Sequence, residues 1–214
     1  MRQHDLPPRT TLFRPGETPS RIYFVAKGWV ASLAVASDTT PALTLLCIRG
    51  DVVGLDCVEG SDCVDEVVTL SSTEMISVPM DAYRTLMRER ASVMWFTHRE
   101  LLRELCMLKY MNTVIGRYKA PDRLAQLLFI LLQRMRNTFH GRLDTLSLPL
   151  TQEEIGQLLG LTNVSVNRAF RKLEADGLIT TGRQSVRFTN PAALEQRVLS
   201  AHNGDLLRRI VKRD

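Results

Sequence analysis

The sequence is poor in the residues and segments that mark exported, membrane-spanning or metal-binding proteins. Its four cysteines lie 10, 6 and 43 positions apart without a CxxC pair, and its four histidines are scattered, so neither a disulfide framework nor a zinc site is predicted. The longest nearly uninterrupted apolar run, residues 124–132, is far shorter than the roughly 20 residues that span a bilayer. The opening segment MRQHDLPPRTT carries charge and proline where a secretory signal needs an apolar stretch. We therefore expect a cytoplasmic protein with free thiols, no metal and no membrane contact.

Length and charge point to two small domains of unequal charge. The chain has 214 residues, 44% of them hydrophobic and 24% charged, which is typical of globular proteins and long enough for two cores. Residues 1–112 hold 12 basic against 14 acidic side chains, whereas residues 113–214 hold 16 against 9. A basic C-terminal half fits a polyanionic partner such as nucleic acid, although a solvated helix face gives similar counts.

The N-terminal part has the pattern of a small β domain. Between residues 10 and 78, short β-rich runs such as TLF, IYFV, WVASLAVA, ALTLLCI, VVTL and MISVP alternate with turn residues. Pro15–Gly16 and Lys27–Gly28 form the clearest turns. This spacing predicts a β-sandwich or roll, and helical periodicity replaces it from Asp81, where Tyr83, Leu86 and Met87 share a face.

A long helix is predicted over residues 92–117. This helix has two apolar faces: a seam, given below, and a second face with Trp95, Leu102 and Cys106. One helix would therefore have to pack on two sides. One interpretation is a buried core helix. The other is a parallel self-dimerisation helix in which Asn112 fixes the register. The seam of that dimer has alternating spacings of three and four residues and consists of Met94, His98, Leu101, Leu105, Leu108, Asn112 and Ile115.

The domain joint is expected near residues 118–121. Pro121 suits the first turn of a new helix, which carries an apolar stripe and ends at His140–Gly141. We predict a domain over residues 1–118 that includes the long helix, a second domain over 119–190, and a partly helical tail over 191–214.

The most informative segment runs from Thr151 to Asn190. Thr151 with Glu154 forms a capping-box pattern at the start of a helix. Gly160 permits a sharp turn, and Thr162 can cap the helix that follows. These signals predict a helix-turn-helix.

The second helix of this motif has the composition of a DNA-reading helix. Val166, Phe170 and Leu173 would turn inward and leave an outer surface with no acid before Glu174. The segment LITTGRQSVRFTN after Gly177 reads as a hairpin with Gly182 in its turn, so the motif is winged. The outer or leading residues are Asn163, Val164, Ser165, Asn167, Arg168, Arg171 and Lys172.

This segment carries a specific resemblance. EEIGQLLGLTNVSVNRAFRKLEADGLI resembles the DNA-binding domain of the bacterial Crp-Fnr superfamily of transcription regulators. FRPGETPSRIYFVAKGWV and RGDVVGLD are similar to parts of that family's cyclic-nucleotide-binding-type β-roll, closer to the Fnr branch. The resemblance covers residues 10–190 and implies an α+β fold with an N-terminal roll, a long dimerisation helix and a C-terminal winged helix-turn-helix. It also implies a homodimer on a palindromic operator.

The roll departs from the family members that bind cyclic AMP. Those members have a Gly-Glu turn and an Arg-Ser pair that grips the phosphate, but here Asp65–Glu66 stands about where the Arg-Ser would lie. No Lys or Arg occurs between Arg49 and Arg84, while seven acids lie from Asp51 to Glu74. A cyclic phosphate would meet repulsion without a bidentate partner, so we expect no cyclic nucleotide.

The cysteines also depart from the family's iron-sulfur pattern. Oxygen-sensing members use an N-terminal cysteine cluster, whereas no cysteine precedes Cys47 here, so we expect no iron-sulfur cluster and no other cofactor. Cys57 and Cys63 are flanked by acids, which raises rather than lowers a thiol pKa and favours ordinary roll residues. The alternative is a redox switch across this loop.

We interpret the chain as a dimeric, sequence-specific DNA-binding regulator and not as an enzyme. Arg168 would read guanine, while Val164 replaces an acid that many family members use and would pack on a thymine methyl. Asn163, Ser165 and Asn167 would contact bases or adjacent backbone. The expected partners are double-stranded DNA, a second copy of the chain and RNA polymerase; the alternative is a ligand or redox sensor that signals mainly through a protein partner. The expected phosphate contacts are Thr151, Gln152, Thr162, Arg171, Lys172, Arg183 and Arg187.

Overall fold

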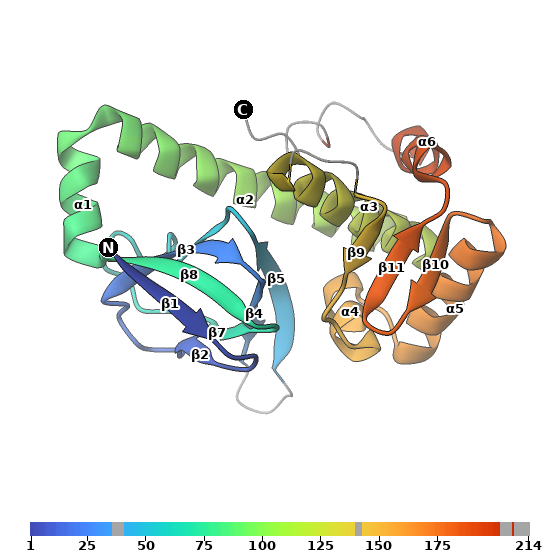
Figure 1. Cartoon of the computed structure of the whole chain (residues 1–214), viewed down its shortest axis with the longest axis horizontal. Helices are drawn as coiled ribbons and strands as arrows, with labels where there is room; N and C mark the ends of the chain where they lie inside the picture. The colour runs from blue at the N-terminus through green and yellow to red at the C-terminus, as the bar shows by residue number, and fades with distance from the viewer. Residues whose placement is uncertain (36–40, 140–142, 202–206, 208–214) are drawn as a thin grey trace. The chain divides into compact units, whose positions relative to one another are not determined.

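The chain folds into two compact units, residues 1–102 and 103–214. The computed structural model describes residues 1–35, 41–139, 143–201 and 207 (Figure 1). The division falls inside helix α2 (Ala91–Arg117), while Tyr118 and Lys119 separate α2 from α3 (Ala120–Phe139) at the place expected for the domain joint. The exact domain limits stay a prediction.

The first unit is a β-roll of two four-stranded antiparallel sheets (Figure 1). One sheet has the strand order β1-β8-β3-β6 and the other β2-β7-β4-β5. The strands are β1 (Arg2–Leu6), β2 (Thr11–Phe13), β3 (Arg21–Lys27), β4 (Trp29–Ala34), β5 (Ala42–Ile48), β6 (Val52–Val53), β7 (Glu66–Thr69) and β8 (Thr73–Pro79).

Strand β1 was not expected from the sequence. It pairs antiparallel with β8, with Arg2 opposite Ser77 and Leu6 opposite Thr73. Leu6 is its only apolar residue, so the alternation that predicts a half-buried strand is absent. Pairing with β8, some 70 positions away, makes this segment a strand.

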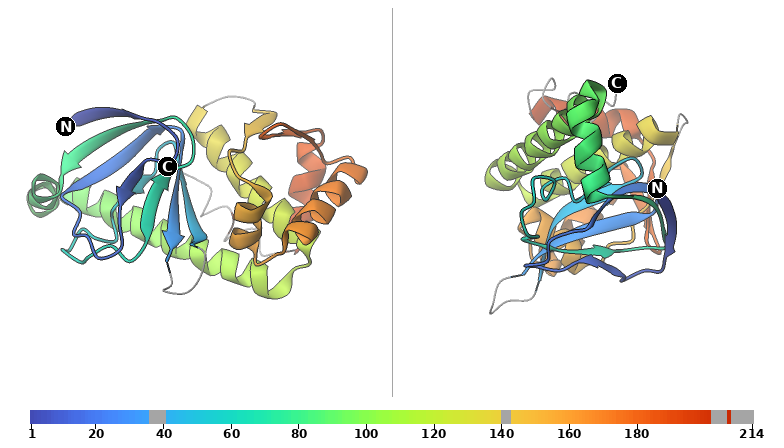
Figure 2. Two further views of the ribbon diagram at one scale, coloured as in Figure 1. Left: turned by 90° about the horizontal axis from the view of Figure 1, so that it is seen from below. Right: turned by 90° about the vertical axis from the view of Figure 1, so that its left-hand side faces the viewer.

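Two buried clusters organise the roll. The first draws residues from both sheets, which Figure 2 shows from two further directions, and comprises Phe13, Val25, Val30, Cys47, Val53, Cys57, Cys63, Val67 and Met75. The second joins the sheet β1-β8-β3-β6 and the segment after β6 to the helices α1 (Met80–Glu89) and α2, and comprises Ile22, Val52, Leu55, Val58, Val78, Met80, Tyr83 and Met87. Leu86, expected on the same buried face of α1, is exposed because it lies on the far side of Tyr83 from Met87.

The second unit is a winged helix-turn-helix built around α3. Every residue from Leu124 to Leu132 is buried, including Gln126, which accepts a hydrogen bond from the Tyr110 hydroxyl. The predicted helix end at His140–Gly141 lies outside the described residues, as do the tail residues 202–206 and 208–214. The other elements are β9 (Thr145–Ser147), α4 (Gln152–Leu159), α5 (Asn163–Ala175), β10 (Ile179–Gly182), β11 (Ser185–Phe188) and α6 (Pro191–Ala201).

None of the helices in the described part of the chain is long and apolar enough to span a membrane.

Candidate nucleic-acid interface

Helix α4 begins with the predicted capping box. The Glu154 amide donates to Thr151 Oγ1 at 3.1 Å, and the Thr151 amide donates to a Glu154 carboxylate oxygen at 2.7 Å. The reciprocal pair satisfies two backbone donors that the first turn would otherwise leave unpaired. The cap therefore fixes where α4 starts, with Thr151 and Gln152 exposed at its leading end.

The turn between α4 and α5 depends on two glycines. Gly160 has φ = 60°, a left-handed conformation that a residue with Cβ adopts at a cost. A Cβ on Gly156 would lie 2.5 Å from the Leu161 carbonyl oxygen, so only glycine lets the chain pass that close. Arg123 of α3, which sequence analysis did not single out, donates to the carbonyls of Leu159 and Gly160 at 2.9 and 3.3 Å and ties this turn to α3.

Helix α5 presents the outer surface that its sequence predicts. Thr162 Oγ1 accepts from the Ser165 amide at 3.2 Å, so the predicted cap is confirmed. Val166 and Leu173 are fully buried and Phe170 is half-buried, which fixes the rotation of the helix. Val164 leaves 60% of its surface exposed. The exposed residues are Asn163, Val164, Arg168, Arg171 and Lys172, while Ser165 and Asn167 are half-buried.

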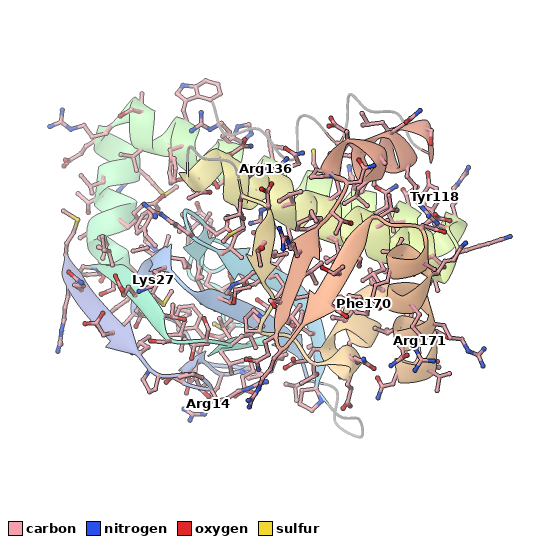
Figure 3. The ribbon with its side chains drawn as sticks, turned by 45° about the vertical axis from the view of Figure 1, so that its right-hand side comes forward. Arg14, Lys27, Tyr118, Arg136, Phe170 and Arg171 are labelled. Atoms are coloured by element: carbon pink, nitrogen blue, oxygen red, sulfur yellow. The ribbon has the colours of Figure 1, made fainter. Side chains whose placement is uncertain are left out.

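The basic residues of α5 differ in their partners. Arg171 projects outward from the helix in Figure 3, and within the described residues neither Arg171 nor Arg168 forms an ion pair. Lys172 Nζ instead lies 2.8 Å from a carboxylate oxygen of Asp176, one turn further along. Hydrogen bonds, first from Lys172 and then from Arg197, lower the pKa of Asp176.

An ion-pair chain continues from Asp176 into the rest of the unit. Arg197 of α6 lies 2.8 Å from Asp176 and 2.8 Å from Asp122 of α3. No local sequence pattern predicts these ion pairs, because the partners of Arg197 are 21 and 75 positions away. It connects the C-terminal end of α5 to two other helices.

The wing is a two-residue hairpin held to α5. Gly182 pairs with Ser185, so Arg183 and Gln184 form the tip, and Gln184 rather than Gly182 takes the positive φ of 51°. Arg183 is exposed at this tip.

Glu174, near the end of α5, connects the helix to the wing. It accepts from the Thr181 amide at 2.9 Å and from the Thr181 hydroxyl at 2.6 Å. These hydrogen bonds lower the pKa of Glu174. Helix α5 and the wing are thus joined by a direct polar contact that no local sequence pattern predicts.

Arg187 stands apart from the other expected phosphate contacts. It pairs with Thr180 on one side and with Thr145 of β9 on the other. Its side chain lines a hollow of about 800 Å³ together with Arg136, Asp144 and the start of α6. Arg136 is labelled in Figure 3 near the end of α3. The structure therefore places Arg183 at the wing tip and Arg187 at the hollow.

Helix α2 has an apolar face without a cover in the described structure. Trp95 is 70% exposed, and Leu105 and Leu108 are each 45% exposed. Two of the expected seam residues lie at its edge. Leu101 packs against the second roll cluster. Ile115 lies beside Gly160, where an added Cβ would be 3.3 Å from the Ile115 side chain. The exposed residues of the predicted seam are Met94, His98, Leu105, Leu108 and Asn112. Of the second predicted apolar face, Trp95 and Leu102 are also exposed and Cys106 is half-buried.

Within the described part of the roll, acidic residues occupy the two positions where the resemblance implies a cationic partner for a cyclic phosphate. Asp65, about where the family's arginine would lie, accepts a hydrogen bond from the Thr44 hydroxyl at 3.0 Å. Glu66 accepts from the Thr11 hydroxyl at 3.1 Å. Arg84 donates instead to the Val58 carbonyl at 2.6 Å and to Asp81. The residues present do not fit a cyclic nucleotide.

The cysteines are free thiols, and three of them lie in the first roll cluster. Cys57 Sγ and Cys63 Sγ are 3.6 Å apart. Burial, and next the Asp56 carboxylate, raises the pKa of Cys57; burial raises the pKa of Cys63. The predicted direction of both shifts is confirmed, but burial rather than acidic neighbours is the larger cause. Within the described residues, no group of three or more His, Cys, Asp or Glu side chains could hold a metal ion.

Two family models match the chain in the two units just described. Residues 3–90 match the cyclic nucleotide-binding domain, and residues 122–197 match the Crp-like helix-turn-helix domain. Together they cover most of the chain, and the second contains every element of the interface from α4 to the wing.

Known transcription regulators align with most of this chain, across both units. The chain is 26% identical over 186 residues to the transcriptional regulatory protein btr of Bordetella pertussis, covering 87% of this chain and 76% of that protein. It is 26% identical over 178 residues to the cAMP-activated global transcriptional regulator CRP of Haemophilus influenzae, covering 82% and 79%. The solved structure of FixK2 from Bradyrhizobium japonicum superposes with a TM-score of 0.81 at 21% identity and covers 91% of this chain and 96% of that one.

Proposed function

The chain belongs to the Crp-Fnr superfamily of sequence-specific, DNA-binding transcription regulators, and we propose that it acts as a homodimer on a palindromic operator. The observation that carries the DNA-reading part is the outer face of α5. It is exposed, begins at a capped N-terminus and contains no acid from Asn163 to Leu173. Helices of this kind lie in the major groove with their first residues against base edges.

The proposed roles divide the interface into base and phosphate contacts. Arg168 reads guanine through two hydrogen bonds, and Val164 packs against a thymine methyl group. Asn163, Ser165 and Asn167 contact bases or the adjacent backbone. Phosphates are held by Thr151, Gln152, Thr162, Arg171, Lys172, Arg183 and Arg187.

The face of α2 described above supports the proposed dimer. Exposed leucines on one side of a 27-residue helix leave apolar surface that a second copy would bury. A parallel pair places Asn112 against its counterpart, where a polar side chain fixes register. Two-fold symmetry then sets the two half-sites about 34 Å apart, one turn of DNA.

The remaining parts of the proposal concern partners and effectors. RNA polymerase is the protein partner, the cytoplasm is the site of action, and the chain catalyses no reaction of its own. The roll takes no cyclic nucleotide, because the carboxylates of Asp65 and Glu66 stand where the family's phosphate-binding pair would lie.

Selection of bound sequences from random DNA duplexes tests the central proposal. We expect a two-fold symmetric consensus, bound by the full chain with an affinity that falls steeply as salt concentration rises. Recovery of no enriched sequence, or of an asymmetric one bound by monomers, would contradict it. A duplex with both half-sites scrambled serves as the control for non-specific binding.

A further inference from the structure

The segment between β6 and β7 brings two thiols into contact. Cys57 Sγ and Cys63 Sγ are 3.6 Å apart, and a disulfide requires about 2.05 Å. Closing this distance needs a displacement of about 1.5 Å, which a loop can absorb more easily than a strand. The loop is a succession of turns: the Cys57 amide donates to the Gly54 carbonyl, and the Gly60 amide donates to the Cys57 carbonyl.

The same loop is attached to the helices. Cys57 belongs to the first roll cluster, whereas the next residue, Val58, belongs to the cluster that packs on α1 and α2. Arg84 of α1 also donates to the Val58 carbonyl at 2.6 Å. A movement of Cys57 is therefore passed directly to the contact between this loop and α1.

The two cysteines are both held through their backbone and differ in exposure. The Cys63 amide and carbonyl are paired with Glu17 and Gly16, and both chain neighbours of Cys63 are exposed. Cys57 is more deeply buried, with 1% of its surface exposed against 5% for Cys63. Cys63 is thus the thiol that a reagent from solution reaches first.

We propose that Cys57 and Cys63 form an oxidisable dithiol site that closes to an intrachain disulfide by exchange with a low-molecular-weight disulfide, and that closure loosens this loop from α1 and α2. The Cys63 thiolate attacks the small disulfide and releases one thiolate, which gives a mixed disulfide. The Cys57 thiolate then attacks Cys63 Sγ and releases the second. Two electrons pass from the protein to the small disulfide, and the two protons lost by the cysteines end on the two thiols released.

Burial raises the pKa of both thiols, so in the reduced protein both are protonated at neutral pH. This property distinguishes the site from fast thiolate sensors, because exchange waits for the loop to open. Intracellular disulfides of this transient kind are those with a regulatory role.

The sequence makes the test direct, because no Lys or Arg lies between Arg49 and Arg84. Trypsin therefore leaves both cysteines on one peptide, residues 50–84, while Cys47 and Cys106 fall on others. The reduced full chain is incubated with oxidised glutathione, free thiols are blocked with N-ethylmaleimide, and the digest is weighed without reduction. We expect peptide 50–84 to lose two hydrogens and to accept no blocking group, and a reducing agent to restore it.

Three variants sharpen the result. Cys47→Ser, in the same buried cluster, should leave closure intact. Cys63→Ala should prevent formation of the disulfide. If Cys63→Ala does not fold, Cys57→Ala should prevent formation of the disulfide in the same way. Two results would overturn the site. In one, peptide 50–84 carries two N-ethylmaleimide groups although glutathione has reacted with Cys106. In the other, peptide 50–84 keeps a bound glutathione and forms no disulfide.

Hydrogen exchange tests the second half of the proposal. Amides in residues 80–101 should exchange faster in the oxidised protein than in the reduced one. The same treatment should not change their exchange in Cys63→Ala. Unchanged exchange in a protein whose disulfide has formed would overturn the link to α1 and α2.

Discussion

Lys172, on the exposed side of α5, is held 2.8 Å from the carboxylate of Asp176. The same carboxylate also binds Arg197, so it is tied to the body of the unit. A phosphate that recruits Lys172 must therefore compete with a carboxylate already in place. This relationship decides how much Lys172 contributes to binding.

The first prediction concerns this competition. Lys172→Ala should weaken binding to all sequences alike and reduce the salt slope of log K by about 1. Asp176→Asn should strengthen binding to all sequences and steepen the slope, because it releases Lys172. The double variant should behave like Lys172→Ala; an Asp176→Asn gain that persists without Lys172 would mean that the carboxylate repels DNA directly.

Arg168, the sixth residue of α5, should read one base pair. Arg168→Ala should cost about 1–3 kcal/mol per half-site and relax preference at that base pair, because two hydrogen bonds to guanine are lost. Arg171→Ala, a phosphate contact, is the matched control and should weaken all operator variants equally. Affinities for a panel of single-base operator variants measure both, and a uniform loss for Arg168→Ala would reduce its role to a backbone contact.

The proposed dimer is tested by charge on α2. Leu105→Glu or Leu108→Glu places like charges against each other across a two-fold axis and should abolish both the dimer and operator binding. Val64→Glu also replaces an exposed apolar residue, here in the roll loop, and should leave the dimer intact. Sedimentation velocity reports the state, and unchanged dimers in both α2 variants would refute this interface.

The helix-turn-helix should be intolerant of one methyl group. Gly156→Ala puts a Cβ 2.5 Å from the Leu161 carbonyl oxygen and should lower the free energy of unfolding by about 1–3 kcal/mol. Gly116→Ala adds the same group to helix α2 in open space and should raise it by about 0.5–1 kcal/mol. Thermal unfolding followed by circular dichroism compares the two; equal stability would show that the turn relaxes without cost.

The roll should not respond to cyclic nucleotides. Titration calorimetry with cyclic AMP and cyclic GMP is expected to show no useful binding, because Asp65 and Glu66 would face the phosphate. The cAMP-activated relative from Haemophilus influenzae, measured in parallel, gives the positive signal. Micromolar affinity for either nucleotide in this chain would require a different phosphate site.

Local signals made the helix-turn-helix predictable. The cap residues Thr151 and Thr162 and the turn glycine Gly160 act within four positions of the backbone they serve, so the sequence contains the whole interaction. The burial of Val166 and Leu173 followed from helical spacing in the same way. These features were confirmed.

Long-range partners could not be predicted in this way. Strand β1 exists through its pairing with β8, and Glu174 finds Thr181 only once the wing folds back on α5. Leu101 and Ile115 share the spacing of the α2 seam, but each packs within its own unit. Helical spacing determines which residues share a face of α2. It does not determine whether residues at the edge of that face pack within their own unit or against a second copy of the helix.

The uninterrupted burial of Leu124–Leu132 has a consequence during synthesis. This segment leaves the ribosome before α4, α5 and α6 exist, and Gln126 waits for the Val198 carbonyl, 72 positions later, to accept its amide hydrogen. Until α6 is made, the face of α3 that α6 covers stays exposed, and such apolar surfaces attract chaperones or other nascent chains. A ribosome that stalls before Pro191 would therefore release an aggregation-prone chain even though every residue proposed to contact DNA has been made.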